Sequence, residues 1–259
     1  MQDKVQKALA ESLTSHTTEI IPYLPYLLQD FWSLSSDPAQ MIDLLRTHTE
    51  FNNACRMLDL ACGKEIASVC LAEAFACTAK GIDIIPEFIA EARRKAKEHA
   101  VEALCTFVAG DVTEAVNTET DYDLAVWGGA GNLLGSYPAT LAGIARTVKP
   151  GGFILMDDAY TVNRQILRFH HDYLTEEEWM RAFAENGLRI LSFVKGEQGV
   201  TSEAYMEDLN NIRRRAGELS DRHPELSSLF EDYVKNQQCE YEDLQDGVVP
   251  VLWLLQKFK

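Results

Sequence analysis

From position 56 onward, short apolar runs alternate with longer stretches whose apolar residues follow helical spacing. The first run, RMLDLACG from Arg56 to Gly63, suits a buried parallel strand, although a run this short does not separate strand from helix by periodicity alone. After Gly63 the apolar positions recur at the spacing of a helix. A strand that passes through a tight glycine turn into a helix leaves free N–H groups at the helix start, which suits a nucleotide-type ligand.

The same alternation continues to the end of the chain and predicts a parallel sheet with helices on both faces. Further strands are expected at 78–85, 104–112, 122–132, 153–158, 188–194 and 247–255. Pro250 cannot donate a hydrogen bond to a neighbouring strand, so it indicates an edge or bulge position near the start of the last strand.

Two helical segments fall outside this rhythm. Residues 1–50 contain no strand-turn-helix unit, and residues 201–238 form a polar helical stretch just before the last strand. We therefore expect a single domain, 1–259, made of a helical N-terminal extension (1–50), a core (51–200 and 247–259) and a helical insertion (201–246).

Charge and composition narrow the class of protein. With 46% hydrophobic and 25% charged residues, the chain has the make-up of a soluble globular protein. A net charge of −16 disfavours a general nucleic-acid binder, which needs a phosphate-neutralising surface, while leaving a local basic groove open. No apolar run approaches the length of a membrane span and the first residues lack a signal-peptide core, so we expect a cytoplasmic protein without membrane contact.

The six cysteines include no C-x-x-C pair, and most have apolar neighbours. We expect free buried thiols in a reducing compartment, with zinc ligation or disulfides as the alternatives. No metal site is expected.

Three acids stand at the carboxyl ends of the first three predicted strands: Asp59, Asp83 and Asp111. In an open parallel sheet, ligands bind outside those strand ends, near the point where the strand order reverses. A ligand with a ribose diol and an adenine amine offers hydrogen-bond donors to carboxylates, and charge-assisted bonds of this kind are comparatively strong. The three acids therefore predict an adenosine-type site at this edge.

Four segments together carry a specific resemblance: LDLACG, GIDIIPEFIAEAR, AGDV and VKPGGFILMDD, in this order and spacing. The chain resembles the S-adenosylmethionine (SAM) dependent methyltransferases with a Rossmann-like fold, from about residue 56 to 200 and again at the last strand. The resemblance implies an α/β, three-layer sandwich. Its seven-stranded sheet is mostly parallel, with an antiparallel last strand inserted beside the fifth.

The resemblance also implies roles for particular residues. Asp83 would bind the ribose hydroxyls, Asp111 would face the adenine amine, and the N–H of Val112 would meet the adenine ring. Asp59 would act mainly through the turn, by orienting the loop and the methionine end of the cofactor. The remaining cofactor-binding candidates are Ala61, Cys62, Gly63, Ile84, Gly110 and Gly128. The product would be S-adenosyl-L-homocysteine.

One departure from the family pattern concerns the turn after the first strand. The family commonly has glycine at three positions where this chain has Ala61, Gly63 and Glu65. Alanine adds only a methyl group near the cofactor. A carboxylate in the first turn of a helix is electrostatically favourable, so Glu65 either caps the helix or meets the cofactor's ammonium group or a substrate amine.

Other enzyme classes lack their motifs here. The turn ACGKEI does not supply the G-x-G-x-x-G of a nicotinamide dehydrogenase, and no P-loop is present. WGGAGN lacks the Asn/Asp-Pro-Pro-aromatic pattern of amino-methylating DNA enzymes, and no Pro-Cys motif of cytosine-C5 enzymes occurs. Methyl transfer to a small molecule or a protein side chain remains, with a non-catalytic SAM-binding or regulatory protein as the alternative.

Methyl transfer from a sulfonium is an in-line displacement that needs alignment and exclusion of water, so a dedicated catalytic residue is not required. If the acceptor must lose a proton, Asp158 and Tyr160 are the first candidates, because they follow a strand end that faces the pocket. Candidates for the acceptor pocket or for proton transfer also include Tyr23, Tyr26, Trp32, Asn132, Asp157 and the pair His170-His171. Each of these also has an ordinary explanation as a packing, turn or surface residue.

The helical insertion and the N-terminal helices are expected to cover the acceptor pocket. Residues 201–246 carry 12 acids against 5 basic residues, and 5 − 12 = −7 disfavours a polyanionic acceptor at that surface. The alternative is an insertion that packs at the far edge of the sheet or mediates dimerisation, and the sequence leaves the oligomeric state open. A small-molecule acceptor is therefore the expected partner.

Overall fold

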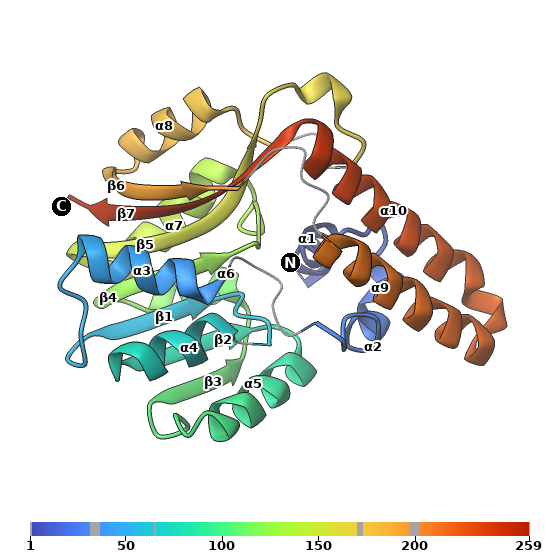
Figure 1. Ribbon diagram of the computed structural model, residues 1–259, viewed down its shortest axis with the longest axis horizontal. Coiled ribbons are helices and arrows are strands. Elements are labelled where there is room, and N and C mark those ends of the chain that lie inside the picture. The colour runs from blue at the N-terminus through green and yellow to red at the C-terminus, as the bar shows by residue number, and fades with distance from the viewer. Residues whose placement is uncertain (1, 32–36, 65, 170–172, 197–202, 259) are drawn as a thin grey trace. The chain divides into compact units, whose positions relative to one another are not determined.

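The computed structural model describes residues 2–31, 37–64, 66–169, 173–196 and 203–258 (Figure 1). The chain forms two compact units. The helical unit comprises Met1–Phe31, Ala159–Glu176 and Gly196–Pro250. The sheet unit comprises Trp32–Asp158, Glu177–Lys195 and Val251–Lys259.

A seven-stranded sheet has the order β3-β2-β1-β4-β5-β7-β6. Its strands are β1 (Arg56–Leu60), β2 (Thr78–Asp83), β3 (Cys105–Ala109), β4 (Tyr122–Gly128), β5 (Val148–Thr161), β6 (Leu188–Lys195) and β7 (Val248–Lys257). The pairs β1–β2, β2–β3, β1–β4 and β4–β5 are parallel, whereas β6–β7 is antiparallel. The predicted fold class is therefore confirmed, including the seventh strand beside the fifth.

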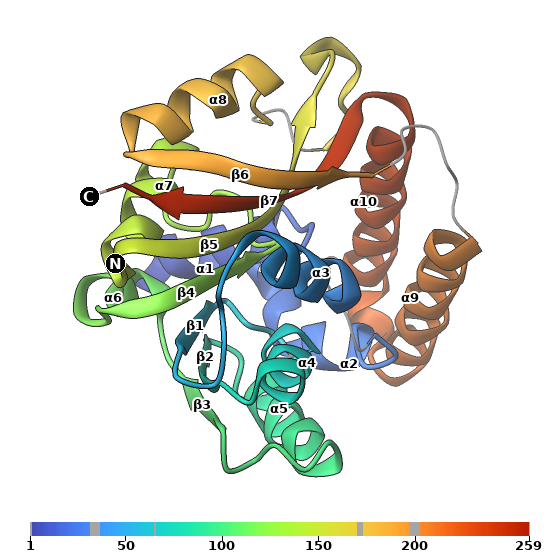
Figure 2. The same ribbon diagram turned by 60° about the vertical axis from the view of Figure 1, so that its left-hand side comes forward.

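Helices cover both faces of this sheet (Figure 2). One face carries α3 (Pro38–His48), α4 (Ile66–Phe75) and α5 (Pro86–Glu98), and the other carries α6 (Val112–Thr118), α7 (Tyr137–Thr147) and α8 (Glu176–Glu185). Helix α5 shows why the sequence folds this way. Pro86 at its first turn suits a helix start, Phe88, Ile89 and Ala92 are buried, and Lys95 and Lys97 lie in the last turn, where positive charge favours the helix dipole.

Each face has its own core. On the first face, aliphatic side chains of α3, α4 and α5 pack on the sheet, among them Met41, Leu45, Val69, Leu71, Ile89 and Ala92. On the second face, Trp179 of α8 lies at the centre of an aromatic cluster. Its ring is 4.7 Å from that of Tyr137, 5.3 Å from that of Phe183 and 5.2 Å from that of Trp253, centroid to centroid. These buried aromatic contacts join α7, α8 and β7.

The helical unit is built from segments far apart in the sequence. It contains α1 (Gln2–Ser12), η1 (Thr18–Tyr23), α2 (Leu24–Leu27), η2 (Arg164–Ile166), α9 (Glu203–Arg222), η3 (Pro224–Leu226) and α10 (Ser227–Asp246). Helices α9 and α10 pack on each other, α9 also contacts α2, and α10 contacts η1. None of the helices in the described ranges is long and apolar enough to cross a membrane.

A buried carboxylate organises the segment that follows β5 in this unit. Asp243 of α10 is 2% exposed, and its oxygens accept hydrogen bonds from the backbone N–H of Arg168 at 2.8 and 2.9 Å and from that of Phe169 at 3.0 Å. The Arg168 guanidinium adds an ion pair at 3.1 Å. Since backbone N–H groups inside a protein need acceptors, this single side chain fixes the 164–169 turn to α10.

Two details of the strands differ from the sequence-based expectations. Strand β5 begins at Val148 and ends at Thr161, so it is longer at both ends than the predicted 153–158. Of the two positions predicted for Pro250, an edge or a bulge near the start of the last strand, the edge is wrong, because β7 lies between β5 and β6 inside the sheet. Pro250 is accommodated because the paired register with β6 begins only at Val251, and the Pro250 carbonyl accepts from the Gly196 N–H at 2.8 Å.

The Asp243 contacts predict a specific loss of stability. Asp243→Ala leaves the buried Phe169 N–H and the part-buried Arg168 N–H without their acceptor, so we expect the free energy of unfolding to fall by about 2–3 kcal/mol in urea denaturation. Asp246→Ala is the matched control, because Asp246 also pairs with Arg168 but its side chain is 51% exposed. That variant should lose at most about 1 kcal/mol. Equal losses in the two variants would contradict the role given to the buried carboxylate.

Candidate functional site

The carboxyl ends of β1, β2 and β3 lie at one edge of the sheet unit. The parallel registers place Asp59 beside Gly81 and Asp83 beside Ala109. Asp111 begins α6 two residues after β3 ends. The three acids predicted to share a site therefore lie in or directly after the carboxyl ends of three adjacent parallel strands.

The turn after β1 curls back toward β2. Ala61 and Gly63 both adopt left-handed backbone conformations, with φ of +56° and +60°. Between them, the Cys62 N–H donates to the Ile82 carbonyl at 3.1 Å. The backbone can turn this tightly because Gly63 pays no steric cost at positive φ, whereas Ala61 carries a Cβ in a conformation that L-residues disfavour.

Asp83 is the group that fixes this turn. Its Oδ2 accepts from the Gly63 N–H at 2.9 Å, and its Oδ1 accepts from the Ile85 N–H at 2.8 Å. The side chain is 7% exposed, and burial raises the pKa of the carboxyl above its ordinary value of 3.8, against the opposing effect of the N–H groups of Ile85, Gly63 and Ile84. The two backbone contacts fix the directions of both carboxylate oxygens, which suits a ligand that brings two hydroxyl donors.

Asp59 is turned into the protein. It is 3% exposed, and the Ser68 hydroxyl of α4 donates to its Oδ2 at 3.0 Å. Ser68 itself is fully buried. This contact ties the end of β1 to the helix that follows the turn, in agreement with an indirect role for Asp59 through the loop.

Asp111 caps helix α6. Its Oδ1 accepts from the Thr113 N–H at 2.8 Å, and the side chain is half-buried. The preceding residue is tied to Asp83 as well, since the Gly110 N–H donates to the Asp83 carbonyl at 2.9 Å. Asp111 thus uses one carboxylate oxygen for the cap, and Val112 follows it as the first residue of α6.

The end of β4 supplies a second glycine turn at the same edge of the sheet unit. Gly128 is the last residue of β4, and Gly129 and Gly131 adopt φ of +67° and +54°. The Gly129 N–H donates to the Asp157 carbonyl at 3.0 Å, and Trp127 Nε1 donates to the Gly131 carbonyl at 3.1 Å. Asn132 follows this turn and is half-buried.

The two first candidates for proton transfer belong to different units. Asp158 ends the β5 portion of the sheet unit, where its Oδ1 accepts from the Tyr137 hydroxyl at 3.4 Å. Its neighbour Asp157 is 8% exposed. Tyr160 belongs to the helical unit and is also 8% exposed.

The aromatic candidates of the N-terminal extension take part in packing within the helical unit. The Tyr23 ring meets the rings of Phe230 and His223, with centroids 5.0 and 5.7 Å away. Tyr26 donates its hydroxyl to Glu218 and accepts from Arg222 at 2.8 Å. These contacts join the N-terminal helices to the insertion. Trp32, Glu65, His170 and His171 lie outside the described residues.

Two buried polar residues near the turn did not stand out in the sequence. Ser68 is the partner of Asp59, and its position five residues after Gly63, on the inner face of the next helix, is the signal that would have found it. Lys64 is only 5% exposed, and its ammonium lies 5.7 Å from the centre of the Phe88 ring.

All six cysteines are free, and within the described ranges no group of three or more metal-ligating side chains is arranged to bind a metal.

A family model described as a methyltransferase domain matches residues 51–217. Among curated proteins, the uncharacterized protein YjhP of Escherichia coli is 28% identical over 154 residues, which are 55% of this chain and 61% of YjhP. That match therefore spans less than two thirds of the relative's length.

Two further similarities extend over more of each protein. The demethylmenaquinone methyltransferase of Symbiobacterium thermophilum is 23% identical over 176 residues, 65% of this chain and 70% of that protein. A crystal structure of a SAM-dependent methyltransferase from Geobacter sulfurreducens, in complex with S-adenosyl-L-homocysteine, has a TM-score of 0.73 at 20% identity. The match covers 90% of this chain and 96% of the Geobacter chain, which shows that the two proteins share a fold. Because the family model matches more than half of the sequence, the chain belongs to the methyltransferase domain family.

Proposed function

We propose that the protein is a SAM-dependent methyltransferase that transfers the methyl group in line to a small molecule or a protein side chain. The observation that carries the proposal is the Asp83 carboxylate, which is buried at the edge where β1, β2 and β3 end and is fixed between the N–H groups of Gly63 and Ile85. In a chain of this family, that acid is at the position expected to meet a ribose diol.

The residues present fit SAM. Asp83 offers acceptor oxygens whose directions are fixed by two backbone N–H groups. One carboxylate oxygen of Asp111 accepts from the Thr113 N–H at the α6 cap, and the second oxygen would accept from the adenine amine. The other residues that would line the cofactor are Asp59, Ala61, Cys62, Gly63, Ile84, Gly110, Val112 and Gly128. When bound, SAM supplies the electrophilic methyl group.

The chain's own contribution is then alignment and exclusion of water. Two turns with left-handed residues, at Ala61–Gly63 and Gly129–Gly131, bring backbone rather than bulky side chains to the edge of the sheet. Since an in-line displacement depends mainly on the approach of the two reacting atoms, fixing these turns is the main catalytic requirement. Where the acceptor must lose a proton, Asp158 is the first candidate to accept it, and Tyr160 the second.

We further propose a small-molecule acceptor. The net charge of −16, and the local −7 (5 − 12) of residues 201–246, oppose the approach of a polyanion. The Symbiobacterium relative, which is named for a small molecule, supports the same class. We also propose that the helical N-terminal segment and the insertion act together, which is supported by their packing on each other within the helical unit.

A non-catalytic SAM-binding protein is the second candidate, because Ala61 and Glu65 depart from the usual turn. Incubation with methyl-labelled SAM and fractionated metabolites separates the two functions. Label recovered in any acceptor supports the transferase. Tight SAM binding with no labelled product from any fraction supports the non-catalytic protein.

The role of Asp83 predicts a loss of cofactor affinity on substitution. Asp83→Ala removes the acceptor for the ribose hydroxyls and releases the Gly63 turn, so SAM binding measured by calorimetry should weaken by about 1.5–3 kcal/mol. Glu87→Ala is the control, because Glu87 is an exposed acid in the first turn of the helix that follows Asp83. It should bind SAM like the wild type. Absence of SAM binding to the wild-type protein, or unchanged affinity in Asp83→Ala, would reject the assignment.

The left-handed conformation of Ala61 predicts a gain of stability with glycine. An L-residue in this region costs roughly 1–2 kcal/mol, while glycine loses roughly 0.5–1 kcal/mol of additional chain entropy. Ala61→Gly should therefore raise the free energy of unfolding by up to about 1 kcal/mol and leave SAM binding intact. Ala90→Gly, at an exposed position within α5, should lower it by about 1 kcal/mol. Destabilisation by both glycines would show that Ala61 is not strained.

A further inference from the structure

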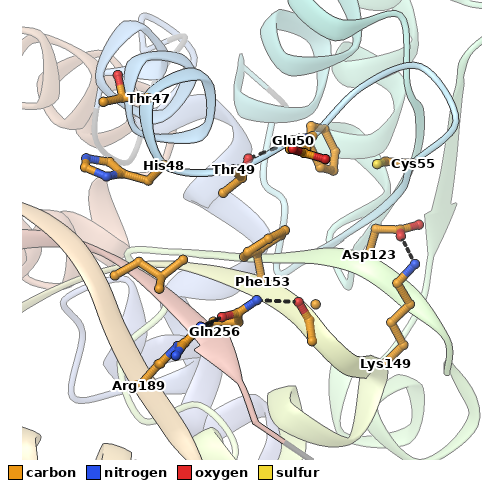
Figure 3. Close-up of a pocket in the computed structure, with 14 residues that line it drawn as sticks. Thr47, His48, Thr49, Glu50, Cys55, Asp123, Lys149, Phe153, Arg189 and Gln256 are labelled. Carbon is orange, nitrogen blue, oxygen red and sulfur yellow. Dashed lines mark hydrogen bonds and ion pairs between the residues drawn. The ribbon is translucent and has the colours of Figure 1, made fainter.

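A hollow lies at the opposite end of the strands from the Asp83 edge. It has a volume of about 640 Å³ and is lined by the end of α3 and the loop after it, by the starts of β4, β5 and β6, and by the end of β7 (Figure 3). This volume is in the range of small-molecule sites. All of its lining residues belong to the sheet unit.

The hollow is separated from the Asp83 edge by the length of the strands. Asp123 lines the hollow near the start of β4, whereas Gly128 ends the same strand at the other edge. Five residues of strand span about 16 Å. A molecule bound in the hollow is therefore too far away to react with one bound beside Asp83, so neither cofactor nor methyl acceptor accounts for it.

An anchored arginine gives the hollow its chemistry. Gln256 donates through Nε2 to the Gly151 carbonyl at 2.9 Å, and its Oε1 accepts from Arg189 Nε at 3.0 Å and from Arg189 Nη2. This chain of bonds holds one edge of the guanidinium and leaves Nη1 directed elsewhere. Among the described residues no carboxylate pairs with Arg189. The guanidinium is positively charged. Because each terminal nitrogen carries two N–H groups, the edge formed by Nη1 and the second N–H of Nη2 can still donate to the two oxygens of a carboxylate.

The other charged side chains that line the hollow also favour a ligand whose negative group lies at Arg189. Lys149 is neutralised by an ion pair with Asp123. Glu50 lies across the half-buried Phe153 ring from Arg189 (Figure 3). A negative group is therefore repelled at the Glu50 side and attracted at the Arg189 side, while the ring between them offers an apolar face for a flat body.

We propose that this hollow binds a small organic carboxylate with a flat, largely apolar body, its carboxylate on Arg189 and its body on Phe153. The site is independent of the cofactor and acceptor sites. Its occupant is an additional small molecule bound at the amino ends of the strands.

Amide chemical-shift mapping on the full-length protein tests the proposal, with indole-3-acetate as the probe and its neutral analogue indole-3-acetamide beside it. We expect the acid to shift the amides of Gly151, Gly152 and Leu191, and the neutral analogue to leave them in place. Arg189→Gln should weaken binding of the acid by about tenfold or more, the effect of losing a hydrogen-bonded charge. Arg181→Gln, which removes an exposed arginine from α8 outside the hollow, should bind the acid like the wild type.

A second variant removes the anchor and keeps the charge. Gln256→Leu leaves the guanidinium without its fixed edge, so binding of indole-3-acetate should weaken, though less than in Arg189→Gln. The same spectra show whether each variant is folded, and either folded variant suffices for the comparison. The proposal is overturned if the acid leaves the lining amides unshifted, if the neutral analogue shifts them equally, or if folded Arg189→Gln or Gln256→Leu binds the acid as tightly as the wild type.

Discussion

The sheet unit depends on one buried carboxylate to join two consecutive turns. Asp83 ends β2, yet its oxygens bind the N–H of Gly63 in the turn after β1 and that of Ile85 before α5. Its carbonyl also accepts from Gly110 after β3. One residue therefore sets the relative positions of three strand ends. Burial raises the pKa of this carboxyl, so the protein accepts an electrostatic cost at the place where a ligand with hydroxyl donors would be bound.

The helical unit uses the same device for a different segment. Asp243 is buried, and its carboxylate accepts from the backbone of Arg168 and Phe169 just after β5. In both units a short acidic side chain satisfies backbone N–H groups that lie outside regular secondary structure. The difference lies in what remains available. Asp243 accepts from both backbone and arginine, whereas the donors to the Asp83 carboxylate within the described part of the chain are backbone N–H groups. This is why Asp83, rather than Asp243, is the candidate ligand-binding acid.

The sequence was sufficient for the sheet because its signals are local and repeated. Apolar runs that contain or end near Asp59, Asp83 and Asp111, alternating with helical stretches, predict the parallel strands, and the family resemblance adds the antiparallel last strand beside the fifth. Long-range partners carried no such signal. Ser68 was missed because its signal, a serine on the inner face of the apolar helix after the turn, does not name Asp59 as the partner. Pro250 was given an edge or bulge position because the sequence does not show that the paired register with β6 starts one residue later.

Aromatic and charged side chains were the hardest to predict, since their contacts join distant segments. Tyr26 has the appearance of a pocket aromatic in the sequence, but in the structure its ring lies 5.5 Å from the guanidinium carbon of Arg215 and 4.7 Å from that of Arg222. The hollow near Arg189 was equally invisible, because its lining comes from six separate segments and follows no motif. Such sites emerge only when the strands are aligned and their amino ends are brought together.

Hydrogen exchange of backbone amides, with and without S-adenosyl-L-homocysteine, tests the central claim most directly. The account predicts that the product slows exchange in the peptides that contain Ala61–Gly63, Asp83–Ile85, Gly110–Val112 and the turn after Gly128. It also predicts unchanged exchange around Gly151 and Arg189, at the other end of the strands. Protection confined to other peptides, or no protection at saturating product, would contradict the claim that these strand ends form the cofactor site.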